Sequence, residues 1–509
     1  MTCGKRREMV VKVAMLVVFF SVMIVVGIYC RKHATDVNGF VLGGRSVGPW
    51  LTAFAYGTSY FSAVIFVGYA GQFGWKFGIA STWIGIGNAF IGSLLAWAVL
   101  ARRTRTMTQK LDSKTMPEFF GTRFDSTMLK VVASIIVFIF LIPYTASLYN
   151  GLSRLFGMAF NLDYTICIVV MAVLTGIYVI AGGYMATAIN DFIQGMIMLI
   201  GIVAVIASVL NSNGGFMESL KSLAQVEDAA VSETPGVFAS FFGPDPFSLL
   251  CVVILTSLGT WGLPQMVQKF YAIKDEKAVE KGTVISTFFA VVVAGGCYFL
   301  GGFGRLYDID VASIGFDAII PAMIEKLSPF LIAVVVVLVL SASMSTLSSL
   351  VLASSSTLTI DLIKGAIVKN LEEKKQVLIM RAFIVVFIAI SAIIAVVQYK
   401  NNVTFIAQLM GVSWGALAGA FLAPFIYSLY WKGVTKISVI VNFIFGSGIM
   451  IANMLFRASF PTLLQSPINC GAFAMIAGLI IVPVVSLITP KPDKEKVAEM
   501  FQPYETSEN

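Results

Sequence analysis

Apolar runs of about 20 residues, separated by short polar connections, dominate the chain. An α-helix needs roughly 20 apolar residues to cross the hydrocarbon core of a bilayer, so each run predicts one transmembrane helix. The pattern therefore predicts an all-α polytopic membrane protein with about 13 spans and a single transmembrane domain over 1–509. The expected spans are 9–30, 50–73, 80–101, 129–149, 163–181, 186–210, 246–270, 283–303, 329–357, 378–398, 403–430, 436–456 and 468–488.

The second and the seventh of these spans carry glycine, proline and polar residues at mid-membrane depth. The interruptions are Gly57 with the polar run 58–62, and Gly259 with Gly262 and Pro264. Glycine and proline at such depths free backbone groups from the helical hydrogen bonds. Each interrupted span opens a block of five spans, 50–210 and 246–430, so the breaks occupy corresponding positions. Paired broken helices are typical of transporters built from inverted repeats, although glycine and proline also kink ordinary packed helices.

The stretch from Ser341 to Asp361 is unusually rich in hydroxyl groups, with 11 of them in the 19 residues from 341 to 359. At about 100° per residue, five positions share one broad helical face. They are Ala342, Ser345, Thr346, Ser348 and Ser349. Hydroxyl and carbonyl oxygens suit a hard cation such as sodium. The alternative is that small side chains only allow two helices to approach closely.

Asp191 lies within the apolar run of the sixth span, in the sequence GGYMATAINDFIQG. A carboxylate inside a membrane is costly unless it faces a cavity, a partner or an ion, which makes Asp191 a candidate functional residue. A helix-capping role after Gly182 and Gly183 fits the spacing equally well.

Composition narrows the chemistry further. Hydrophobic residues make up 58% of the chain and charged residues 12%, against roughly 25% charged in soluble domains. The six cysteines show no paired spacing and His33 is the only histidine, so neither a metal cage nor a catalytic triad is indicated, and no enzyme is expected. The net charge of +8 indicates basic cytoplasmic loops and not nucleic-acid binding, and no obligate protein partner is evident.

The distribution of lysine and arginine predicts the orientation. With the N-terminus outside, 24 of the 35 basic residues fall on the inner side, including seven in the loop 102–130. The first apolar run is long and no cleavage site follows it, so it is expected to remain as a helix. We therefore expect a multi-pass protein of the plasma (inner) membrane with an external N-terminus and a cytoplasmic tail at 489–509.

Five motifs in order along the chain resemble those of the sodium:solute symporter family. They are GGRSVGPW (43–50), GGYMATAINDFIQG (182–195), GLPQMVQKF (262–270), SMSTLSS (343–349) and LYWKGVT (429–435). The pantothenate and proline permease branch is most similar, since INDFIQG and the loop AIKDEKAVEKG resemble the pantothenate permease. The resemblance implies an inverted five-plus-five helix core formed by spans 2–11, with alternating access and sodium-coupled uptake.

The resemblance also implies ion-binding residues. The family's principal sodium site matches Thr58 and Phe61 of the second span, through their carbonyls, and Ala342, Ser345 and Thr346 of the ninth span. Some members hold a second sodium, and the matching residues here are Asp191, Ser345, Ser348 and Ser349. The chain departs from the proline permeases at Tyr60, where they have an aspartate, and this argues against proline itself.

The expected solute pocket lies at the two breaks. Its lining is Thr58, Ser59, Tyr60 and Ser62 from the second span, Tyr144 from the fourth, and Trp261, Gly262 and Gln265 from the seventh. We expect no lysine or arginine at mid-membrane depth in these spans, so the lining suits a small organic solute such as an amino acid or a pantothenate-like monocarboxylate. The sequence thus predicts a sodium-coupled symporter, with a proton-coupled transporter of the same fold or a cation channel as alternatives.

Overall fold

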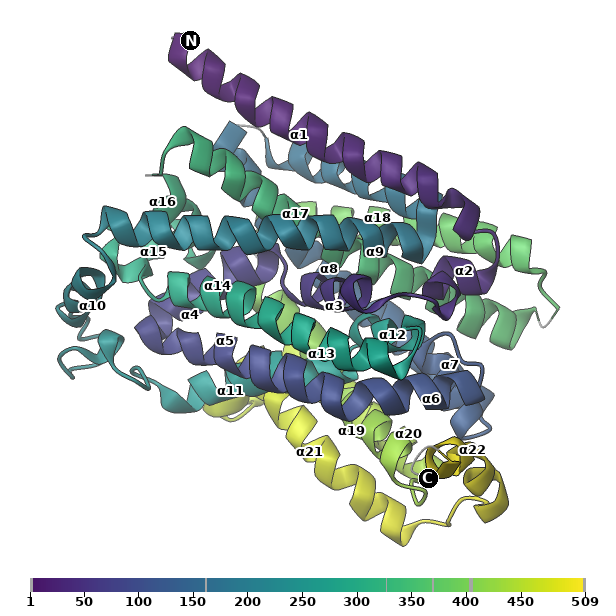
Figure 1. Ribbon diagram of the computed structural model, residues 1–509. Coiled ribbons are helices and arrows are strands. Elements are labelled where there is room, and N and C mark those ends of the chain that lie inside the picture. Colours follow the sequence, from purple (N-terminus) through teal and green to yellow (C-terminus); the bar gives the residue numbers. More distant parts are fainter. Residues whose placement is uncertain (1–2, 161–162, 326, 369, 402–405, 507–509) are drawn as a thin grey trace.

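The computed structural model describes residues 3–160, 163–325, 327–368, 370–401 and 406–506, which form a bundle of helices (Figure 1). In chain order the α-helices are α1 (Cys3–Cys30), α2 (Val37–Leu42), α3 (Pro49–Tyr60), α4 (Ala70–Phe77), α5 (Thr82–Ala89), α6 (Arg102–Lys110), α7 (Met116–Arg123), α8 (Thr127–Phe160), α9 (Tyr164–Ser212), α10 (Phe216–Ala224), α11 (Pro246–Leu258), α12 (Pro264–Ala272), α13 (Glu276–Ala290), α14 (Gly296–Gly301), α15 (Val311–Ile314), α16 (Ile319–Glu325), α17 (Pro329–Thr357), α18 (Glu373–Asn401), α19 (Ile406–Tyr430), α20 (Lys436–Leu455), α21 (Pro467–Ile488) and α22 (Lys494–Thr506). The expected start of the eleventh span at 403 lies outside the described residues.

The described residues contain ten helical stretches that are long and apolar enough to cross a membrane, or eleven when the bent pair Pro246–Gly262 and Pro264–Ala272 counts as one span. Two of these stretches, Val64–Lys110 and Tyr164–Ser212, have 47 and 49 residues. At 1.5 Å per residue each would be about 70 Å long, more than twice the thickness of the hydrocarbon core. Each is therefore two crossings, which accounts for the thirteen expected segments.

Both long stretches turn back at a glycine with positive φ, Gly78 (φ +62°) and Gly183 (φ +57°), a backbone conformation that glycine adopts without steric cost. Glycines before and after Gly78 in the chain show the change of direction: Gly57 lies against Phe289, Gly74 against Gly301, and Gly85 against Gly295. The residue number of the partner increases from 289 to 301 and then decreases to 295, so the chain reverses its direction at Gly78. The two halves of α9 likewise both lie along α1. Helix α1 lines one cavity together with residues between 166 and 171, and a second cavity together with residues between 193 and 201.

The two expected breaks are confirmed. Helix α3 ends at Tyr60, Phe61 is extended (φ −100°, ψ 104°), and helical structure resumes at Val64. In the second half, α11 is followed by the short turn Gly259–Gly262, and Leu263 is extended (φ −86°, ψ 120°) before α12 begins. The residue before a proline is pushed out of the helical region, so Pro264 at the start of α12 accounts for this break and its 46° bend.

Helix α17 lies inside the bundle, where every residue from Val335 to Asp361 is buried (Figure 1). No water reaches this depth in a membrane, so each hydroxyl needs a partner within the protein. Ser343 meets this need inside its own helix, since its hydroxyl donates to the Val339 carbonyl one turn earlier. The hydroxyls that face α3 also contact the backbone of that helix, and they form the site described below.

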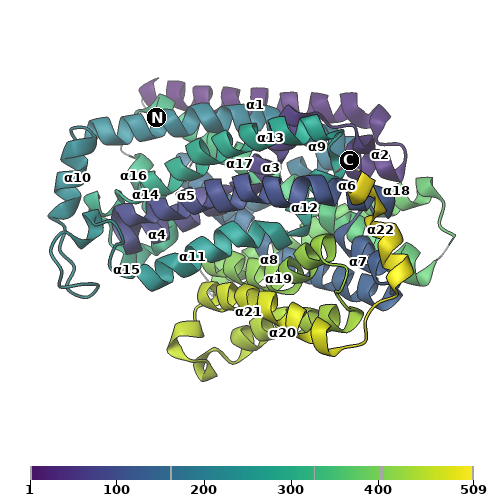
Figure 2. The same cartoon turned by 60° about the horizontal axis from the view of Figure 1, so that its bottom comes forward.

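The C-terminal helix α22 packs against α6 (Figure 2), and the centre of its Phe501 ring lies 5.4 Å from the guanidinium of Arg123 in α7. The Tyr504 hydroxyl donates to the Arg103 carbonyl at 2.7 Å, and Lys496 pairs with Asp125 at 3.3 Å. The tail therefore lies on the same side of the protein as the basic segment 102–130.

Candidate functional site

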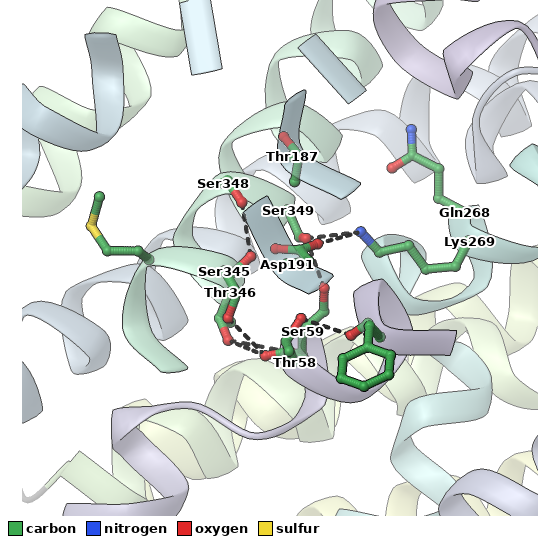
Figure 3. A network of polar contacts seen from close by, with 12 residues as sticks. Thr58, Ser59, Thr187, Asp191, Gln268, Lys269, Ser345, Thr346, Ser348 and Ser349 are labelled. Carbon is green, nitrogen blue, oxygen red and sulfur yellow. Dashed lines mark hydrogen bonds and ion pairs between the residues drawn. The ribbon is translucent and has the colours of Figure 1, made fainter. Parts of the chain in front are cut away.

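Four oxygen atoms from α3 and α17 meet beside the first break (Figure 3). The Ser345 and Thr346 hydroxyls each lie 3.1 Å from the Thr58 carbonyl oxygen, and each also lies 3.1 Å from the Ala342 carbonyl oxygen. The Thr58 carbonyl is exposed to α17 because α3 ends here: the preceding Gly57 carbonyl accepts the N–H of Phe61, the residue that closes the helix.

These oxygens suit a sodium ion. All four are buried and neutral, two carbonyls and two hydroxyls, which is the donor chemistry that a hard monovalent cation accepts. In the described part of the chain no three histidine, cysteine or acidic side chains gather, so a transition-metal centre has no ligands here. The ring of Phe61, the fifth expected ligand residue, stacks on Tyr60 at a centroid distance of 4.3 Å, and its carbonyl remains the predicted ligand.

A second polar cluster adjoins the first (Figure 3). The Ser59 and Ser349 hydroxyls are 2.7 Å apart, and the Lys269 ammonium from α12 donates to the Ser349 oxygen at 2.9 Å. The same ammonium lies 4.0 Å from a carboxylate oxygen of Asp191 and 5.2 Å from the centre of the Tyr184 ring. The carboxylate of α9 and the hydroxyl of α17 are thus bridged by a lysine, which sequence reasoning did not include.

The sequence predicts no lysine among the buried groups of the broken spans, but the structure places one inside the protein beside the first break. Lys269 is only 2% exposed, because α12 is buried along its whole length after the bend at Pro264. In the sequence, Lys269 stands near the end of an apolar span and reads as the first residue of a basic loop. One signal was available: Gln265 and Lys269 are four residues apart, so a helix that continued past the break would place both on one face.

An aromatic group connects the two breaks. The Trp414 ring of α19 lies 6.0 Å from the Tyr60 ring and 5.9 Å from the Tyr144 ring, measured between centroids. It also lies against the second break, since a Cβ added at Gly259 would be 3.1 Å from the ring. Trp414 was not identified from the sequence, because it lies in an apolar, glycine-rich span and no pattern of polar residues around it indicates a function.

Several polar groups around these breaks are buried and have no hydrogen-bond partner among the described residues. They are the Ser62 and Tyr144 hydroxyls, both side-chain groups of the Gln265 amide and the indole N–H of Trp414. The Tyr144 hydroxyl lies near both Ser62 and Trp414 without making a hydrogen bond of normal geometry to either. Buried polar groups normally find partners, so these groups are available to a polar ligand.

The remaining expected residues point elsewhere. The Trp261 indole N–H donates to the Ile91 carbonyl at 3.0 Å, so this side chain faces the neighbouring span. Gly262 lies against the backbone of Leu422, where an added Cβ would come within 2.7 Å. The Ser348 hydroxyl donates within its own helix, to the Ser345 carbonyl at 2.9 Å.

Known proteins share the sequence pattern and the fold of this chain. The model of the sodium:solute symporter family matches residues 40–446. The osmoregulated proline transporter OpuE of Bacillus subtilis (strain 168) is 29% identical over 489 residues, 94% of each chain. The sodium/proline symporter of Staphylococcus aureus (strain JH9) is 30% identical over 494 residues, 94% of this chain and 92% of the relative.

Two solved structures share the fold. A Na+-coupled sialic acid symporter in a substrate-bound outward-open state aligns with a TM-score of 0.73 at 16% identity, over 95% of this chain and 99% of that one. Mhp1, a nucleobase-cation-symport-1 family transporter in a closed conformation, aligns with a TM-score of 0.50 at 14% identity, over 91% and 97% of the two chains.

Proposed function

Because this chain belongs to the sodium:solute symporter family, and is therefore a sodium-coupled membrane transporter and not an enzyme, we propose that it imports a small amino acid or monocarboxylate by alternating access. Proline is the first candidate, since a sodium/proline symporter is 30% identical over nearly the whole length. A pantothenate-like monocarboxylate is the second. It rests on INDFIQG and AIKDEKAVEKG, which resemble the pantothenate permease, while Tyr60 stands where the proline permeases have an aspartate and donates its hydroxyl hydrogen to the Thr256 carbonyl.

The observation that carries the proposal is the shared oxygen site of α3 and α17. Sodium is held by the carbonyls of Thr58, Phe61 and Ala342 and the hydroxyls of Ser345 and Thr346, and the solute binds at the same break, beside Tyr60, Ser62, Tyr144 and Gln265. An ion that needs oxygens from both helices favours the arrangement in which the break faces α17. Ion and solute binding therefore stabilise one conformation together, which is the requirement for coupling.

The same proposal includes the orientation and the repeats. The N-terminus is external and the tail 489–509 is cytoplasmic in the cell membrane. The packing of α22 on the basic segment 102–130 supports a common side for the two. The blocks 50–210 and 246–430 form the inverted repeats, and the break in the first span of each supports this assignment.

Uptake by the purified protein in proteoliposomes tests the proposal. Labelled proline and labelled pantothenate are offered with an inward sodium gradient, with potassium in place of sodium, and with a proton gradient alone. We expect one of these solutes to accumulate above its equilibrium level only under the sodium gradient. Accumulation driven by protons without sodium would favour the proton-coupled alternative, and a sodium current without solute would favour a channel.

A further inference from the structure

The ammonium group of Lys269 stands where the carboxylate of α9 approaches the hydroxyl face of α17. We propose that Lys269 is a tethered cation which takes the place of a second sodium ion between Asp191 and Ser349, so that this symporter carries one sodium per solute. The inference deepens the proposed function and rests on its sodium site at Thr58, Ser345 and Thr346.

Charge balance is the first argument. Asp191 is completely buried, and within the described residues neither of its carboxylate oxygens accepts a hydrogen bond. A buried carboxylate that stays ionised requires a cation. Lys269, itself 2% exposed, supplies one at 4.0 Å (Figure 3), so the charge that a second sodium would balance is already balanced.

The hydroxyl groups give the second argument. An ion between α9 and α17 would need the Ser348 and Ser349 oxygens in addition to Asp191. The Ser349 oxygen already accepts from Lys269 at 2.9 Å and lies 2.7 Å from the Ser59 hydroxyl. The Ser348 hydroxyl donates within its own helix, to the Ser345 carbonyl. The Ser349 oxygen that would face a second ion is therefore already engaged by the ammonium of Lys269.

A chain of contacts also links Lys269 to the first sodium site. Lys269 bonds to Ser349, Ser349 bonds to Ser59, and Ser59 follows Thr58, whose carbonyl meets Ser345 and Thr346. The ammonium of α12 is thus linked to the end of α3 through Ser349. Because Lys269 is covalently attached, its charge is not transported, and the first sodium site keeps its own oxygens from Thr58, Ser345 and Thr346 when the lysine is replaced.

Counting bound sodium tests the inference directly. Equilibrium binding of radioactive sodium to the purified protein gives the number of ions per transporter, and the sodium dependence of uptake gives the cooperativity. We expect the wild type to bind one sodium, with a hyperbolic uptake curve. Lys269→Gln leaves Asp191 without its cation, so this variant should bind two sodium ions and show a sigmoidal curve with a Hill coefficient approaching two.

The matched control is Asp191→Asn/Lys269→Met, which removes both charges and should bind one sodium again. Two sodium ions on the wild type would overturn the inference, as would a Lys269→Gln variant that still binds one with a hyperbolic curve. If Lys269→Gln fails to fold, the number of sodium ions bound by the wild type and by the double variant still tests the inference. Two bound sodium ions on either protein would refute the tethered cation. No sodium bound to the wild type would instead contradict the proposed sodium site itself.

Discussion

Replacing Ser345 and Thr346 by alanine together removes two of the five proposed sodium ligands. Both hydroxyls lie 3.1 Å from the Thr58 carbonyl, and α17 stays apolar and helical after the change. A hydrogen-bond-like contact to a charged group contributes about 1.5–3 kcal/mol, so two of them amount to roughly 3–6 kcal/mol. At about 1.4 kcal/mol per factor of ten, the sodium dissociation constant should rise roughly 10²- to 10⁴-fold.

Thermal unfolding of the purified protein in sodium chloride and in choline chloride measures this loss. Sodium at about 100 times its dissociation constant stabilises a one-site protein by roughly 2.7 kcal/mol, so the wild type should melt at a higher temperature in sodium. The double variant should show almost no difference between the two salts. Without sodium it should already be less stable than the wild type, because the Thr58 carbonyl loses both partners.

Ser343→Ala provides the matched control. Ser343 is as deeply buried in the same helix, but its hydroxyl donates to the Val339 carbonyl of that helix and not to α3. This variant should keep the full sodium-dependent shift. If the Ser345→Ala/Thr346→Ala protein kept that shift too, the sodium site would lie elsewhere and the assignment of Thr58 would be wrong.

Three further predictions concern the solute, the packing and the topology. Gln265→Ala should raise the half-saturating solute concentration by up to about tenfold with little change in the sodium constant, because its amide has no partner among the described residues; a larger effect on sodium would contradict this. Gly74→Ala should lower the melting temperature by an amount equivalent to about 1–3 kcal/mol, because the added Cβ would lie 2.0 Å from the Gly301 carbonyl. Gly448→Ala is the control and should not lower it, because there is open space at its Cβ. Equal melting temperatures of the two variants would refute the contact. Reporter enzymes fused to the two ends should be active on opposite sides of the membrane, and activity on one side only would overturn the orientation.

Features that depend on local chemistry could be predicted from the sequence. The apolar runs have the length of membrane spans, and Pro264 marks the second break because a proline pushes the residue before it out of the helical region. Gly57 lies near the first break but inside α3, which continues to Tyr60. The serine and threonine face of α17 was expected to meet the first break, and the structure brings Ser345 and Thr346 to Thr58.

Features that depend on the direction of a side chain in the folded bundle could not be predicted. The burial of Lys269 depends on how α12 packs after the 46° bend, where the whole helix is buried. Trp414 contacts both breaks only because α19 crosses them. Trp261 was assigned to the pocket as a large side chain at a break, but nothing in its neighbours indicated that its indole would turn to Ile91.

The crossing of α4 and α14 limits how this protein can change. The backbones touch: a Cβ at Gly74 would meet the Gly301 carbonyl at 2.0 Å, and a Cβ at Gly301 would meet the Ala70 carbonyl at 2.0 Å. In most helix pairs, a larger residue on one side can be compensated by a smaller residue on the other. Here both partners are already glycine, and the obstructing atoms are carbonyls that no substitution removes. A damaging change at either glycine should therefore have no second-site suppressor in the opposite helix, and only reversion to glycine should restore the contact.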